Sequence, residues 1–353
     1  MSEQRRQTAR HLAVGAILLL AGFLFSGELL AQSLVERLGF EKDARLLIIN
    51  ADDFGMCHSA NVGTISAFER GGVTSSTIMA PCPWFLEGAR WAKEHKRASV
   101  GVHLTLTSEW GIYKWGPVTG WKNAPGLCDE NGWLVKDEGQ LYTGKNLDQA
   151  EAECRAQIER ALAVGWDVTH IDCHMGCLQY DPRYLAVYLK LAKEYNFPCR
   201  MPSKRMVNEE FSVALKSGAF GKMSDEMVDT VLKGYRAMLD QFAAAGIITP
   251  DELILSSPKS PWETERFWKG IMEAQKPGTV MELYIHCADN SEEMKMFSGS
   301  QRQRYFDTEF FSDPRTRQWI ADQGIQLISY RELRELQRTG KPIPRIDYSP
   351  WTE

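Results

Sequence analysis

The stretch Leu46-Leu47-Ile48-Ile49-Asn50-Ala51-Asp52-Asp53-Phe54-Gly55 decides the fold of this chain. Its first four residues form a short apolar run, which is typical of a strand that is buried on both faces. Two adjacent carboxylates, Asp52 and Asp53, follow this run, and such a pair is costly unless a cation or a proton shares the site. One interpretation is a metal ligand next to a general base at a strand exit. The other is a turn or a helix cap, because Asp and Gly also form turns.

Segments typical of strands and helices alternate along the rest of the chain. We expect strands at 73–79, 99–106, 167–173, 197–201, 253–255, 280–286 and 326–329. We expect helices at 60–70, 84–96, 147–164, 183–195 and 330–337, with mostly helical structure over 205–246. This alternation predicts an α/β fold with a parallel sheet closed or nearly closed into a barrel. In such barrels the active-site residues lie at the carboxyl ends of the strands.

The N-terminus has the pattern of a targeting segment. Three arginines precede an apolar run from Leu12 to Phe25, which is short for a membrane span but fits the core of a signal peptide. We therefore expect residues 1–31 to direct export to the periplasm or the extracellular space, with an uncleaved membrane anchor as the alternative. Residues 32–44 are then a connector, and 45–353 form a single catalytic domain.

Composition is ordinary for a soluble globular protein, with 44% hydrophobic and 25% charged residues. The net charge of −5 and the lack of a basic cluster exclude nucleic acid as an expected partner. The eight cysteines permit disulfides in an exported chain. Their spacing matches no structural zinc site, so we expect most of them to be small core residues.

Histidines gather on the expected strands. Four of the seven fall there: His103, His170, His174 and His286. In the run Thr169-His170-Ile171-Asp172-Cys173-His174, side-chain alternation places His170, Asp172 and His174 on one face of the strand. Metal ligation with supporting hydrogen bonds is the expected reason for three ionisable groups on such a face. One carboxylate, two imidazoles and open positions suit Zn²⁺ or a similar divalent ion.

Two further features bear on the site. Arg200 lies on the expected strand 197–201 and could bind a substrate group, orient an aspartate or form an ordinary salt bridge, with Glu282 as a candidate buried partner. The segment 107–145 is rich in Trp and Gly and shows no clear period. A loop of this length is usually functional, so we expect it to border the active site and to stack Trp110 or Trp115 on a sugar. The alternative is a packed structural insertion.

These motifs together resemble a known family. The order and spacing of Leu46–Gly55, Val73-Thr74-Ser75-Ser76-Thr77, Gly101-x-His103 and Thr169-His-x-Asp-x-His174 are similar to those of the YdjC/ChbG/HpnK-type carbohydrate deacetylases. The resemblance covers roughly residues 45–335. Two stretches depart from the commoner family pattern, Cys57-His58-Ser59 and Met175-Gly176-Cys177, and this leaves the substrate open.

The resemblance implies an irregular TIM-like (β/α) barrel that binds one divalent metal ion through Asp53, His103 and His174. Zn or Mg is the expected ion, and Mn or Co would also fit. Asp52 would be the general base, and His286 would match the late strand-end histidine of the family.

The expected reaction removes the N-acetyl group from an amino sugar or glycolipid and releases acetate. Asp52 would take the proton of the attacking water, His286 would protonate the amine, and Arg200 would assist them. The expected partner is an acetylated sugar, while a membrane tether and a homodimer stay open. The alternatives are a metal-dependent phosphoesterase or other barrel amidohydrolase, and a non-catalytic sugar-binding protein.

Overall fold

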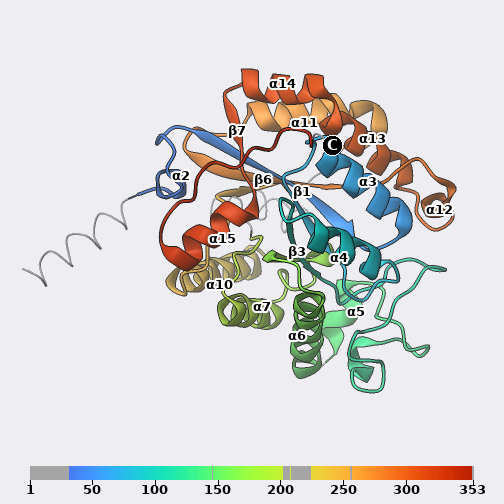
Figure 1. Cartoon of the computed structure of the whole chain (residues 1–353). Coiled ribbons are helices and arrows are strands. Elements are labelled where there is room, and N and C mark those ends of the chain that lie inside the picture. Colours follow the sequence, from blue (N-terminus) through green and yellow to red (C-terminus); the bar gives the residue numbers. More distant parts are fainter. Residues whose placement is uncertain (1–31, 145, 202–206, 208–223, 255–256, 352–353) are drawn as a thin grey trace, which may run out of the picture.

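The structure is a computed structural model that describes residues 32–144, 146–201, 207, 224–254 and 257–351. Within this part, one curved sheet of parallel strands is surrounded by helices (Figure 1). Its strands are β1 (Arg45–Phe54), β2 (Ser75–Ile78), β3 (Ser99–Leu104), β4 (Val168–Cys173), β5 (Glu252–Leu253), β6 (Thr279–His286) and β7 (Ile325–Leu327). The expected barrel-like α/β fold is thereby confirmed.

The strand order shows how the barrel is left open. The path runs β4-β3-β2-β1-β6-β5, and β7 pairs with β1 beside it. On one edge of β1, Arg45–Leu47 pairs with β7 and Asn50–Phe54 pairs with β2, while β6 follows the other edge. In the described residues the two ends of the path, β4 and β5, are not joined, so the sheet forms an incompletely closed barrel.

Strand β1 is buried on both faces, as its apolar run predicts. Leu47 and Ile49 belong to the main hydrophobic core, whereas Leu46 and Ile48 belong to a second cluster with residues of α15. Because side chains alternate along a strand, Asp52 continues the face of Leu46 and Ile48. The same strand therefore contributes first to the core and then to a polar site.

Helices and short turns connect the strands. The α-helices are α2 (Leu34–Arg37), α3 (His58–Glu69), α4 (Phe85–Glu94), α5 (Glu138–Thr143), α6 (Leu147–Val164), α7 (Pro182–Tyr195), α10 (Asp225–Ala244), α11 (Thr264–Glu273), α12 (Glu292–Lys295), α13 (Gln301–Ser312), α14 (Pro314–Asp322) and α15 (Tyr330–Thr339). The 3₁₀ turns are η1 (Pro125–Leu127), η2 (His174–Gly176) and η4 (Pro261–Glu263). Helix α6 has the expected bounds, and Gly165 ends it in the left-handed conformation with φ of 89°.

The expected strand at 197–201 was wrong. Only an isolated bridge joins Cys199 to Ile171 there, so Arg200 lies on an irregular segment beside β4. Of the expected helical stretch 205–246, Asp225–Ala244 is a helix, and most of residues 205–223 lie outside the described residues. Residue 255, the end of another expected strand, also lies outside them.

Two expectations concern export and the cysteines. The targeting prediction rests on residues 1–31, which lie outside the described residues. Across the part of the chain that the structure describes, no helix has both the length and the apolar character needed to cross a membrane. All eight cysteines are free and all but Cys128 are buried, which confirms that most of them are core residues.

Candidate functional site

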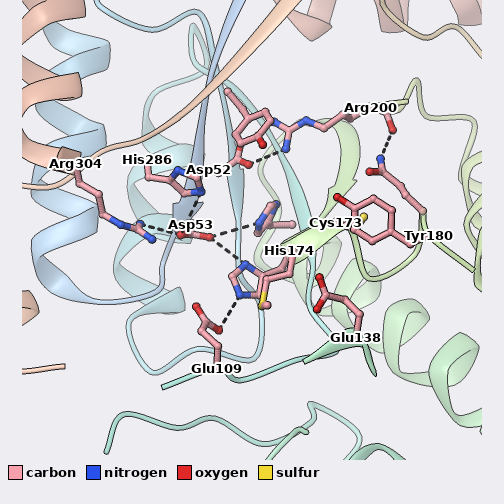
Figure 2. A pocket seen from close by; sticks show the side chains of 15 residues that line it. Asp52, Asp53, Glu109, Glu138, Cys173, His174, Tyr180, Arg200, His286 and Arg304 are labelled. Atoms are coloured by element: carbon pink, nitrogen blue, oxygen red, sulfur yellow. Dashed lines mark hydrogen bonds and ion pairs between the residues drawn. The ribbon is translucent and has the colours of Figure 1, made fainter. Parts of the chain in front are cut away.

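A pocket of about 390 Å³ opens at the carboxyl ends of the strands. The parallel register places Asp52 opposite His286 and His103 opposite Asp172. All six site residues predicted from the sequence line this pocket (Figure 2): Asp52, Asp53, His103, His174, Arg200 and His286. The fold thus brings together side chains that are far apart in the sequence.

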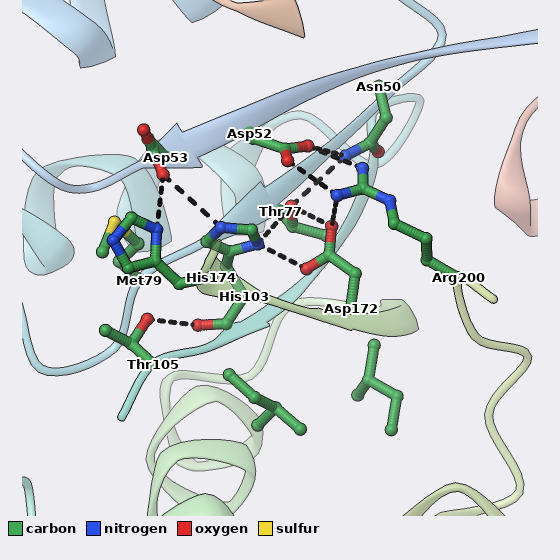
Figure 3. A network of polar contacts seen from close by, with 12 residues as sticks. Asn50, Asp52, Asp53, Thr77, Met79, His103, Thr105, Asp172, His174 and Arg200 are labelled. Carbon is green, nitrogen blue, oxygen red and sulfur yellow. Dashed lines mark hydrogen bonds and ion pairs between the residues drawn. The ribbon is translucent and has the colours of Figure 1, made fainter. Parts of the chain in front are cut away.

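Asp53 lies at the centre of three potential metal ligands. One of its carboxylate oxygens, Oδ1, is 3.4 Å from Nε2 of His103 and 3.3 Å from Nδ1 of His174 (Figure 3). Asp53, His103 and His174 are all buried, and each offers one ligand atom within 4.8 Å of the others. In the described residues, neither carboxylate oxygen of Asp53 takes part in a hydrogen bond. A buried carboxylate without hydrogen bonds beside two imidazoles fits a divalent cation such as Zn²⁺ at Oδ1, while Arg304 forms an ion pair with Oδ2.

The backbone explains how two adjacent aspartates serve different partners. Asp53 has a φ of 64°, which is uncommon for a residue other than glycine and costs free energy. This conformation turns Asp53 toward the histidines, whereas Asp52 faces Arg200. The two adjacent carboxylates therefore point in different directions.

Asp52 is held by a buried arginine. The guanidinium of Arg200 donates two hydrogen bonds of 2.7 Å to the two oxygens of Asp52. It also lies 3.1 Å from Asp172 and donates a 2.8 Å hydrogen bond from Nε to Glu282. Burial alone would raise the pKa of Asp52, but the charge and hydrogen bonds of Arg200 outweigh burial and lower the pKa to about 2. Of the interpretations open for Arg200, the structure supports orientation of an aspartate, with Glu282 as its buried partner.

Each potential histidine ligand has a second carboxylate on its far nitrogen. Nδ1 of His103 is 2.6 Å from Asp172, and Nε2 of His174 is 3.0 Å from Glu109. Such carboxylates commonly orient metal-binding imidazoles. Glu109 was missed from the sequence, because its place in an irregular segment after β3 carries no periodic signal.

His174 is not on a strand, contrary to the prediction. Strand β4 ends at Cys173, and His174 begins the turn η2, in which Met175 and Gly176 have φ of 53° and 66°. At Gly176 a Cβ atom would lie 2.4 Å from the ring of Tyr180, so a side chain there would collide with it. The Met175-Gly176 departure from the family pattern therefore forms a tight turn next to a potential ligand.

His170 shares the strand but does not belong to the metal site. Its ring stacks on Tyr330 with centroids 3.8 Å apart, and its Nε2 lies 3.3 Å from the side-chain oxygen of Asn50. Burial lowers the pKa of His170 well below its usual value, and Arg200 lowers it further, so the ring is neutral at pH 7. His170 is a packed core histidine. Of the other two ionisable residues predicted on this face, His174 joins the group around Asp53 and Asp172 is hydrogen-bonded to His103.

Two residues beside Asp53 complete the centre. Arg304 of α13 places Nη1 2.8 Å from Oδ2 of Asp53, and Nε2 of His286 is 3.9 Å from the same oxygen. Burial would raise the pKa of Asp53, yet Arg304 and the neighbouring histidines hold it well below the usual range. Sequence reasoning missed Arg304, because an arginine on an amphipathic helix usually faces solvent.

The segment 107–145 borders the pocket in a different way from the one predicted. Glu109 and Glu138 line the pocket, but none of the described tryptophans is among its lining residues. Trp115 is only 2% exposed and packs its ring at 5.6 Å from that of Trp110. For Trp115 the structure favours the packed structural insertion, because its ring is buried. Trp110 is half-buried and packs on Trp115 and on Phe297, so its stacking on a sugar stays a prediction.

Fold and site together define a class: a barrel-like enzyme with a buried Asp-His-His cluster that could hold a metal ion at the carboxyl ends of its strands. The chain belongs to the YdjC-like protein family, whose model matches residues 46–322. The family assignment expected from the motifs is thereby confirmed.

Proteins of known name agree with this assignment. The chain is 29% identical to a carbohydrate deacetylase of Brevibacillus brevis, over 81% of this chain and 99% of that protein. It is 27% identical to a carbohydrate deacetylase of Geobacillus stearothermophilus, over 83% and 99% of the two chains. A crystal structure from Enterococcus faecalis V583, described as a candidate cellobiose-phosphate cleavage protein, matches with a TM-score of 0.64 and 27% identity, covering 82% of this chain and 99% of that one.

Proposed function

We propose that this protein is a carbohydrate N-deacetylase that uses one divalent metal ion to hydrolyse the acetamido group of an amino sugar. The observation that carries the proposal is the buried trio Asp53, His103 and His174, with the Asp52–Arg200 pair beside it. The shared YdjC-like family and the names of its relatives support the amide as the bond that is cleaved. Zn or Mg is the expected ion, and Mn or Co would also suit this ligand set.

When bound, the ion would polarise the acetyl carbonyl and acidify a water molecule. Asp52 is ionised at neutral pH and can accept the proton of that water, while Arg200 keeps its carboxylate in one orientation. His286 would give a proton to the departing amine. Burial and the charge of Arg304 lower the pKa of His286 to about 4, so its ring is neutral at rest. The ring lines the pocket and is 35% exposed, so it would first take up a proton from solvent and then pass that proton to the amine.

A two-metal phosphoesterase is the main rival. A second group of potential ligands exists, formed by Asp52, His103 and Asp172. However, the guanidinium of Arg200 already lies between Asp52 and Asp172, at 2.7 Å and 3.1 Å. A second ion would have to displace this buried cation. The arrangement therefore favours one ion, and a titration that gives two ions per chain would contradict the proposal.

Acetate release tests the activity directly. Purified protein is incubated with N-acetylglucosamine and with short chitooligosaccharides, with and without a chelator, and acetate is measured enzymatically. We expect release that stops in the chelator and returns with added metal. Asp53→Asn should lose metal and activity together. Sugar binding without acetate release from any of these substrates would favour the non-catalytic rival.

We also propose that residues 1–31 export the protein, with the catalytic domain starting near Arg45. The support is the basic start and short apolar run of the sequence. Fractionation of native cells with N-terminal sequencing of the recovered protein tests this. Full-length protein with an intact N-terminus in the cytosol would contradict it, whereas recovery from the membrane would favour the anchor.

A further inference from the structure

We infer that Glu109 is a positioning residue that fixes the imidazole of His174 with its proton on Nε2, which leaves Nδ1 free for the metal ion. The inference rests on the proposed metal dependence and goes beyond it. It makes the irregular segment after β3 part of the metal site. It also assigns different ligating nitrogens to the two histidines.

The contacts of His174 carry the first step. Nε2 of His174 is 3.0 Å from Oε2 of Glu109, and Nδ1 is 3.3 Å from Oδ1 of Asp53 (Figure 2). An ionised carboxylate can only accept hydrogen bonds, so Nε2, which is hydrogen-bonded to Glu109, carries a proton. Nδ1 makes no such bond, because neither oxygen of Asp53 takes part in a hydrogen bond within the described residues. In a neutral imidazole the other nitrogen then has a free lone pair. That nitrogen, Nδ1, is the one directed at Asp53.

In His103 the roles of the two ring nitrogens are reversed. Its Nδ1 is held by Asp172 at 2.6 Å, and its Nε2 lies 3.4 Å from Asp53 (Figure 3). Thr77 donates a 2.8 Å hydrogen bond to the other oxygen of Asp172 and fixes that carboxylate in turn. His103 projects from strand β3, whereas His174 projects from the turn η2. This difference in backbone explains why the two rings present different nitrogens to one point.

Buried contacts within its own segment hold Glu109 in place. The indole of Trp115 donates a 2.9 Å hydrogen bond to the carbonyl oxygen of Thr107, and the backbone N–H of Trp115 donates to the hydroxyl of Ser108 at 3.2 Å. The backbone N–H of Ser108 donates to the carbonyl of Val135 at 2.8 Å. Glu109 therefore follows directly on a backbone that is fixed from two directions. The aromatic residues of this segment serve the site by anchoring its carboxylate.

The test measures metal affinity without substrate. Zn²⁺ affinity of the folded full-length protein is determined by competition with a chromophoric chelator for wild type, Glu109→Ala and Glu109→Gln. Glu138→Gln is the matched control, because Glu138 lies in the same segment and lines the same pocket but makes no hydrogen bond to an imidazole in the described residues. We expect Glu109→Ala to lose about 10–100-fold in affinity, as loss of an orienting partner typically does.

Glu109→Gln should lose less than Glu109→Ala, because its amide oxygen can still accept from Nε2, and the control should bind like wild type. Long-range ¹H–¹⁵N spectra of the zinc-bound protein should show a protonated Nε2 at His174 and a protonated Nδ1 at His103. Wild-type affinity in Glu109→Ala, an equal loss in Glu138→Gln, or zinc on Nε2 of His174 would each overturn the inference. Failure of the deacetylase proposal would appear only with substrate, so the two can be told apart.

Discussion

Replacing Arg200 with methionine should destabilise the protein strongly, because this arginine is the buried counter-ion of three carboxylates. Its side chain is 5% exposed, and it contacts Asp52 at 2.7 Å, Asp172 at 3.1 Å and Glu282 at 2.8 Å. Methionine fills much of the same volume but leaves the three acidic groups without their shared cation. The main cost is therefore electrostatic, with a small contribution from packing.

The expected size follows from the burial of the group. Removing one partner of a buried ion pair typically costs about 3–5 kcal/mol, because it leaves an uncompensated buried charge. Burial raises the pKa of Glu282 to about 7, although the charge of Arg200 acts to lower it. In the variant this carboxyl can therefore take up a proton, which relieves part of the cost. We expect a loss near the lower end, about 3 kcal/mol. At about 2 °C per kcal/mol for a large domain, Tm should fall by about 6 °C.

Urea and thermal unfolding of the metal-free proteins measure this loss. Arg70→Met is the matched control, because Arg70 also makes a 2.7 Å ion pair, with Glu309, but the two side chains are 40% and 43% exposed. Exposed pairs contribute about 0–1 kcal/mol. Adding Glu282→Gln to Arg200→Met should change the stability little further, because this carboxyl can already take up a proton in Arg200→Met. Equal losses in Arg200→Met and Arg70→Met would refute the reasoning.

Three further predictions follow from the site and the segments around it. Asp52→Asn should keep its metal and lose about 10²–10⁴-fold in kcat, whereas Asp53→Asn should lose its metal first. Metal content and kcat are measured for both variants, and loss of metal in Asp52→Asn would reverse the assignment. Trp115→Ala should lower the free energy of unfolding by about 3–5 kcal/mol, because the ring of Trp115 is 2% exposed, while Trp121→Ala should cost little, because the side chain of Trp121 is 57% exposed. Urea unfolding midpoints compare the two variants, and an unchanged stability in Trp115→Ala would contradict the packing role. Burial would raise the pKa of Asp167, but hydrogen bonds and charges from Arg334 and Arg331 outweigh burial and lower the pKa. The ionised carboxyl therefore stabilises the fold at pH values above its pKa in the unfolded chain, and this stabilisation is lost as the pH falls through its pKa in the folded protein. Because this carboxyl is 51% exposed, the effect should be small, and Asp167→Asn should flatten the stability profile on the acid side; identical acid profiles would argue against it.

Much of the architecture was predictable from local pattern. The run Leu46–Ile49 indicated a strand buried on both faces, and the helical period of 147–164 with Gly165 after it predicted α6 with its bounds. Strand ends in parallel sheets converge, so the polar residues after apolar runs pointed to Asp52, Asp53, His103 and His286 as one site. These inferences needed only short-range order and the rule that parallel strands share an edge.

Other features depend on contacts between distant segments. The sequence does not show that Arg304 of α13 reaches Asp53, that Glu109 faces His174, or that His170 stacks on Tyr330. The turn at Met175-Gly176, which takes His174 off the strand, is likewise a tertiary outcome, because a left-handed pair leaves no periodic signal.

The sequence by itself determined the strands, the main helices and the carboxylate-imidazole composition of the centre. Only the tertiary structure decided which carboxylate serves which imidazole, and which nitrogen each ring turns toward Asp53. The physical reason is range. Apolar periodicity is set by neighbours one or two turns or strand residues away, whereas the orientation of a buried polar side chain is set by hydrogen-bond partners that folding brings from anywhere in the chain.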